Sequence, residues 1–80
     1  LIHQKLPYTK AEIVWICRNE MPRTLEDMLA RRTRALFLDA RASAEASPVV
    51  AELMAKELGF SKLWQDSEIS RFNNLVMNYT

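Results

Sequence analysis

The sequence has few of the residues that cofactor and metal sites commonly use, with one cysteine, one glycine and one histidine among 80 residues. A lone cysteine excludes an intrachain disulfide and a cluster of cysteine metal ligands. A dinucleotide-binding fingerprint and a P-loop each need more than one glycine, so Gly59 alone excludes both motifs. The longest apolar run, Ile13–Cys17, is far shorter than the roughly 20 residues that cross a bilayer. We therefore expect no transmembrane helix, no signal peptide, and no nucleotide cofactor or metal bound by this chain.

Charge of either sign is not in excess. Eleven basic and ten acidic residues leave a net charge of +1, which gives no support for a dedicated binder of nucleic acid or of a membrane surface. Apolar residues make up 49% and charged residues 26%, as in soluble globular domains. A single domain of this size buries only about 60% of its unfolded surface. Because it is marginal alone and begins with leucine, we expect an excised or processed part of a longer chain.

The first part of the chain predicts a linker and then a helix. Residues 1–8 show no regular period and are interpreted as an incoming linker in which His3 is exposed to solvent. Thr9 and Glu12 have the spacing of a capping box, which predicts a helix over residues 9–20. This helix is apolar nearly all round, so we expect part of its surface to face a neighbouring domain. Trp15 is expected to be a core or interface anchor. Cys17 is expected to be a small buried residue.

The central part predicts a second helix over residues 25–38. Pro22 cannot continue the first helix, and Thr24 is placed as the next N-cap. The apolar residues of the second helix recur at helical spacing and form one stripe, made of Leu25, Met28, Leu29 and Leu36.

The last half predicts two or three further helices. Asp39 or Ser43 starts a short helix near residues 39–46, and Ser47 followed by Pro48 indicates a break and a new helix over residues 48–58. Gly59 is placed for a left-handed C-cap, and Ser61 caps a last helix over residues 62–78. The expected core positions are Val50, Leu53, Met54, Leu58, Ile69, Phe72, Leu75, Val76 and Tyr79. The predicted fold is all-α, a compact bundle of four to five short helices.

Three arginines stand in the middle of the second predicted helix: Arg31, Arg32 and Arg34. Counting 100° per residue places Arg32 in the centre of the apolar stripe, where a guanidinium needs a partner. The candidate partners are Glu20, Asp39 and Glu45. Arg31 follows Asp27 by four positions, a spacing that favours an ion pair. Three interpretations of Arg32 remain open: an internal salt bridge, docking on another domain, or binding of an anionic ligand.

No constellation in the sequence has the spacing of an active site. The acids that flank the arginines would repel phosphate, which disfavours a helix-turn-helix DNA binder. A free-standing helical module that binds a partner helix in a groove remains the alternative of another class. We therefore expect no catalytic, cofactor-binding or metal-binding residue in this chain.

The order of the residues, rather than their composition, carries a family resemblance. Three stretches, Leu6–Trp15, Arg18–Met21 and Arg23–Arg41, resemble the C-terminal helical domain of FAD-dependent glycerol-3-phosphate dehydrogenases, and Pro48–Phe60 is similar to the continuation in that family. The resemblance is weakest after Ser61. Pro22 departs from the small, helix-compatible residue expected there.

The resemblance implies a parent flavoenzyme that oxidises sn-glycerol 3-phosphate to dihydroxyacetone phosphate, with hydride passing to FAD and electrons to a quinone, or to oxygen in oxidase relatives. FAD and substrate would be bound by upstream domains, on which residues 9–80 would pack as a C-terminal domain. The implied location is cytoplasmic, with peripheral attachment at the inner face of the membrane left open. The candidate interdomain or structural contacts are Trp15, Glu20, Arg31, Arg32, Arg34 and Asp39.

Overall fold

The computed structural model describes residues 1–79, without the side chain of Tyr79. Over this range the chain forms five helices and no strand, which confirms the all-α prediction. The helices are α1 (Lys10–Glu20), the π-helix η1 (Asp27–Arg32), α2 (Ala35–Leu38), α3 (Ala40–Leu58) and α4 (Lys62–Tyr79). The predicted core role of the Tyr79 side chain lies outside the described residues.

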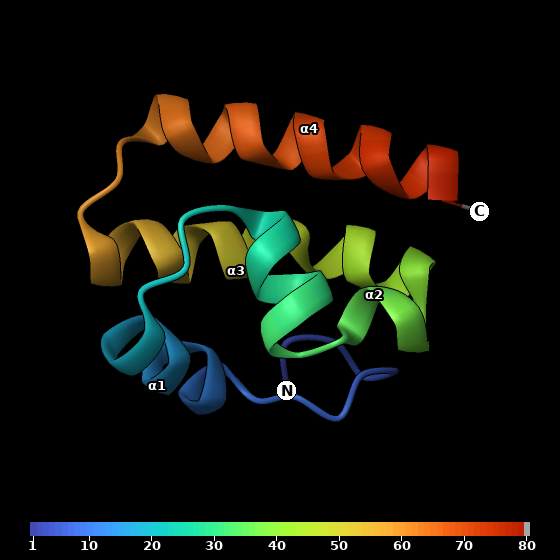
Figure 1. Ribbon diagram of the computed structural model, residues 1–80, viewed down its shortest axis with the longest axis horizontal. Helices are drawn as coiled ribbons and strands as arrows, with labels where there is room; N and C mark the ends of the chain where they lie inside the picture. The colour runs from blue at the N-terminus through green and yellow to red at the C-terminus, as the bar shows by residue number, and fades with distance from the viewer. Residues whose placement is uncertain (80) are drawn as a thin grey trace.

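Helix α3 is the centre of the molecule. It contacts α1, α2 and α4, and α4 runs antiparallel to it along one edge (Figure 1). The N-terminus, α1 and α2 lie along the opposite edge, and η1 crosses between the two edges (Figure 1). The predicted stripe of the second helix is buried, as are Val50, Met54, Phe72 and Val76 of α3 and α4. The remaining predicted core residues, Leu53, Leu58, Ile69 and Leu75, are partly buried against this core.

Helix α1 begins and ends where the sequence predicts. Thr9 and Glu12 form the capping box, with the Glu12 amide donating to Thr9 Oγ1 at 3.1 Å and the Thr9 amide donating to Glu12 Oε1 at 3.0 Å. Met21, in the left-handed region with φ of 50°, ends the helix, and Pro22 follows. Ile13, Ile16 and Cys17 are the buried side of α1.

The prediction of one continuous helix over residues 25–38 is wrong. Thr24 caps its start as expected, because the Asp27 amide donates to Thr24 Oγ1 at 3.0 Å. The backbone then widens into η1, and both the amide and the hydroxyl of Thr33 donate to the Met28 carbonyl, at 3.1 and 3.0 Å. Arg34 has a φ of 62°, so the chain turns before α2 begins. The break arises because the buried Thr33 closes the π turn with its own side chain.

The predicted break at Ser47 and Pro48 is also wrong, because α3 continues through both residues. Proline has no amide hydrogen to donate to the carbonyl four residues earlier, that of Ala44. In the structure the Ser47 hydroxyl donates to the Ala44 carbonyl at 2.7 Å instead. Helix α3 therefore starts after Asp39, which is one of the two predicted starting residues and the N-cap, and ends at Gly59, whose φ of 78° confirms the left-handed C-cap.

The first eight residues form turns that join the core. Ile2 and Leu6 are buried, and the Ile2 amide donates to the Tyr8 carbonyl at 2.9 Å. The prediction that His3 is exposed to solvent is wrong, since its side chain is only 16% exposed and its Nε2 lies 2.7 Å from Glu45 Oε1. The Lys5 amide donates to His3 Nδ1 at 3.1 Å. The first eight residues show no hydrophobic period, yet they bury the side chains of Ile2 and Leu6.

Helix α4 begins after Ser61, whose Oγ accepts from the Trp64 amide at 3.1 Å, as predicted. The Phe60 and Trp64 rings lie 4.3 Å apart, centre to centre, at the corner between α3 and α4. None of the helices within residues 1–79 is long and apolar enough to span a bilayer.

Candidate functional site

Arg32 lies off the core face and forms ion pairs with two acids. Its Nη1 is 2.8 Å from Glu20 Oε1, and its Nε is 3.4 Å from Asp27 Oδ1, with the arginine side chain 38% exposed. The prediction that Arg32 is buried within the apolar stripe is wrong. In a π-helix the hydrogen bonds join residues five positions apart instead of four, so each turn holds more residues and the side chains point in other directions than in an α-helix. For the same reason Asp27 pairs with Arg32 instead of Arg31. Of the three candidate partners, Glu20 is the one that pairs with Arg32, and this pair joins η1 to the last residue of α1.

The other two candidate partners of Arg32 have different roles. The Asp39 carboxylate accepts from the Ala42 amide at 2.9 Å and so caps α3. Glu45 holds His3 against the same helix. Asp39 is therefore a structural residue of α3.

Arg31 and Arg34 are exposed. The Arg34 guanidinium carbon lies 5.6 Å from the centre of the Phe37 ring, a cation–π distance. Because Arg34 follows the end of η1 in a left-handed conformation, its side chain sits beside α2 while that of Arg32 reaches α1. Arg32 and Arg34 thus contact different parts of the domain.

Trp15 projects from the side of α1 that faces away from α3, and it is 59% exposed. Two positions further on, the Cys17 thiol is fully buried, as predicted. Burial raises the pKa of this thiol, and the nearby carboxylate of Glu57 raises it further. Glu57 itself pairs with Arg18 at 2.6 Å. A neutral buried thiol of this kind is a packing group, since the thiolate is the reactive form.

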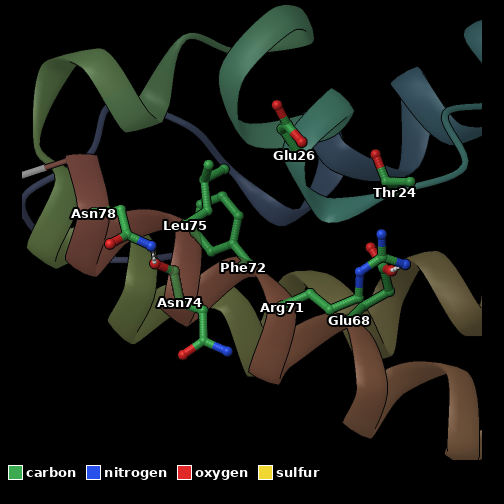
Figure 2. A pocket seen from close by; sticks show the side chains of 8 residues that line it. All are labelled: Thr24, Glu26, Glu68, Arg71, Phe72, Asn74, Leu75 and Asn78. Carbon is green, nitrogen blue, oxygen red and sulfur yellow. Dashed lines mark hydrogen bonds and ion pairs between the residues drawn. The ribbon is translucent and has the colours of Figure 1, made fainter.

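A cavity of about 290 Å³ lies between the start of η1 and the second half of α4 (Figure 2). Its most buried charged residue is Glu68, whose Oε1 accepts from the Leu25 amide at 2.9 Å. Arg71 lies 3.6 Å from the other oxygen of Glu68. Thr24 and Glu26 line the side opposite α4, and Thr24 lies across from Glu68 and Arg71 (Figure 2).

Glu68 was not among the predicted site residues, although the sequence carries a signal for it. Glu68 precedes Phe72 by four positions and Leu75 by seven, so it falls on the same helix face as these apolar residues. A carboxylate on a core face needs hydrogen-bond donors. The first amides of a helix have no acceptor within that helix, and the Leu25 amide, at the start of the helical segment that leads into η1, is such a donor. Through this hydrogen bond Glu68 connects α4 to the helical segment that begins at Leu25.

A second cavity of about 300 Å³ lies beside Pro22, Leu58 and Phe60. Both cavities are at the small end for drug-sized ligands and too small for a dinucleotide, and the one glycine, at the end of α3, makes no phosphate-binding loop. Within residues 1–79 no three His, Cys, Asp or Glu side chains are grouped to hold a metal ion.

Residues 1–65 match the family described as the C-terminal domain of alpha-glycerophosphate oxidase. The chain belongs to this family. The match spans the N-terminal turns, α1, η1, α2 and α3, and ends within the first turn of α4.

Curated relatives point to the same family. The chain is 38% identical to the mitochondrial glycerol-3-phosphate dehydrogenase of Rattus norvegicus over 94% of its own length and 11% of the relative. It is 37% identical to that of Schizosaccharomyces pombe, over 91% of the chain and 11% of the relative, and 40% identical to that of Homo sapiens, over 78% and 8%. The chain thus spans about a tenth of these proteins. No solved structure matches it.

Proposed function

We propose that the chain is the C-terminal helical domain of an FAD-dependent glycerol-3-phosphate dehydrogenase. The parent enzyme oxidises the secondary alcohol of sn-glycerol 3-phosphate to the ketone of dihydroxyacetone phosphate, with hydride passing to FAD and electrons then to a quinone. The observation that carries this proposal is the family match over residues 1–65, together with the relatives reported above, which are named glycerol-3-phosphate dehydrogenases.

In this proposal the domain supplies no catalytic group. FAD and substrate are bound by upstream domains of the same chain, on which the helical domain packs. The small cavities and the lack of a glycine-rich loop support an upstream site for the flavin. We propose a cytoplasmic location for the parent, with peripheral attachment to the inner face of the membrane where electrons reach a quinone; the relatives named above are mitochondrial.

Flavin absorption of the full-length protein tests the proposal. The visible spectrum is recorded without oxygen, before and after adding glycerol 3-phosphate. A flavin band that bleaches on addition is the expected result. An intact full-length protein that carries this segment and shows no flavin band would contradict the proposal and favour a free-standing helical interaction module.

A further inference from the structure

The outward face of α1 presents a large aromatic side chain to solvent. Ile13, Ile16 and Cys17 hold α1 against the core, and Trp15 lies on the opposite face with 59% of its surface exposed. A tryptophan buries up to about 250 Å² when covered, and tryptophan is among the residues that most often dominate the energy of an interface. Trp15 is thus the strongest potential anchor on the described surface.

Helix α2 adds a second apolar contact at the same edge. Of its four residues, Ala35 and Leu36 are buried, while Phe37 and Leu38 are 53% and 60% exposed. Both α1 and α2 lie on the side of α3 that is opposite α4 (Figure 1). Arg34 stands beside Phe37 and supplies a cation at the rim of this contact.

The outward face of α4 has a different character. Leu63 and Met77 are exposed there, but they are separated by fourteen positions, about 21 Å along the helix. Most exposed side chains between them are polar. The family match also ends within the first turn of α4, so a contact common to the family is expected on α1 or α2.

The point of chain entry identifies the occupant. The curated relatives are about ten times longer than this chain, which corresponds to a C-terminal domain. The upstream part of such a protein reaches this domain at Leu1, which lies at the edge formed by α1 and α2 (Figure 1). The buried Ile2 and its hydrogen bond to the Tyr8 carbonyl hold this entry point against the core.

We propose that the outward face of α1 around Trp15, together with Phe37 and Leu38 of α2, is the surface on which the upstream domains of the same chain dock. This inference rests on the proposed function, since it requires the longer parent chain. Trp15 fills an apolar pocket of the upstream part, and the polar face of α4 stays in solvent.

Cysteine labelling of the full-length protein tests the surface. Ala11→Cys places a thiol one turn before Trp15 on the same exposed face and leaves the tryptophan in place. Leu63→Cys is the matched control on α4, where the side chain is 81% exposed. A maleimide is added to each native protein, and labelling of the peptide that carries the new thiol is followed by mass spectrometry.

We expect the Ala11→Cys thiol to react at least about tenfold more slowly than the Leu63→Cys thiol, because a covered side chain reacts only through local opening. Denaturation should equalise the two rates. Adding Trp15→Ala to Ala11→Cys should speed labelling by loosening the contact. Equal native rates at the two positions would overturn the docking surface. The flavin spectrum of the same preparations separates the two proposals, because bleaching by glycerol 3-phosphate would leave the proposed function standing.

Discussion

Helix α3 and residues 25–38 differ in a way that reverses what their sequences predict. The α3 segment contains Pro48 yet forms 19 continuous helical residues. Residues 25–38 contain no proline or glycine, yet they divide into a π-helix, a left-handed residue and a four-residue helix.

The difference shows that a helix continues or ends according to which group satisfies its carbonyl oxygens. At Pro48 the orphaned carbonyl of Ala44 receives the Ser47 hydroxyl, and the chain continues as a helix. At the end of η1 the Met28 carbonyl receives two bonds from Thr33, five positions on. The Thr33 oxygen then accepts from the Ala35 amide at 3.3 Å, which starts α2. The Ser47 hydroxyl thus allows α3 to continue through Pro48, whereas the Thr33 hydroxyl helps to end η1.

The largest expected effect comes from truncating the core of either region. Met28 of η1 and Met54 of α3 are both fully buried, so Met28→Ala and Met54→Ala should each lower the free energy of unfolding by about 2–5 kcal/mol. Urea unfolding followed by circular dichroism measures both losses. A cost at Met28 well below that at Met54 would show that η1 is a loosely held turn and not a core element.

Met77→Ala is the control for these variants. Its side chain is 75% exposed on α4, and surface substitutions usually change stability by less than about 0.5 kcal/mol.

Removing the proline should stabilise α3. Pro48→Ala restores an amide that can donate to the Ala44 carbonyl, and proline inside a helix costs up to about 3 kcal/mol relative to alanine. We expect a gain of about 1–3 kcal/mol in the free energy of unfolding, measured by urea titration. A loss of stability on Pro48→Ala would show that the ring itself supports the helix.

Ser47→Ala sharpens this prediction through a double-mutant cycle. In the natural sequence the loss of the Ser47 hydroxyl should lower the free energy of unfolding by about 1 kcal/mol, because the Ala44 carbonyl loses its donor. In the Pro48→Ala background the new backbone bond should remove most of that cost. If Ser47→Ala lowered the free energy of unfolding equally with and without Pro48→Ala, the Ser47 hydroxyl would not be acting in place of the missing backbone amide.

Caps and apolar periods were predictable from the sequence because they depend on neighbours within four positions. Thr9 with Glu12, Gly59 and Ser61 all begin or end helices where expected, and Asp39 is one of the two predicted starts of its helix. The π turn was not predictable, since counting 100° per residue already assumes an α-helix. Its widening moved Arg32 out of the stripe and gave it the Asp27 carboxylate.

Contacts between distant segments were the least predictable part of the site. The partners His3 and Glu45 are 42 positions apart, and Leu25 and Glu68 are 43 apart. Local spacing carries no information on such pairs. The position of Glu68 on an apolar helix face predicts that its carboxylate needs a donor. The identity of that donor, the Leu25 amide, is known only from the structure.

Glu68 links the two regions, and its removal should have a moderate effect. Glu68→Ala leaves the Leu25 amide without its acceptor in a buried position, at a cost of about 1–3 kcal/mol. Glu68→Gln keeps a carbonyl oxygen at the same place and should restore most of the stability. Urea unfolding of both variants checks the pair. If the glutamine variant were as unstable as the alanine variant, the charge of Glu68, and not its hydrogen bond to Leu25, would hold α4.

The smallest effect is expected at Arg32. Its ion pairs with Glu20 and Asp27 join η1 to α1, but all three side chains are at least one-fifth exposed, and such pairs contribute at most about 1 kcal/mol. Arg32→Ala should therefore lower the urea midpoint slightly, and the loss should shrink as salt screens the pairs. A loss of several kcal/mol that salt does not change would mean that the arginine stem packs in the core after all. That result would put Arg32 back in the apolar stripe, where 100° per residue places it, and would contradict the half-exposed position in which it pairs with Glu20 and Asp27.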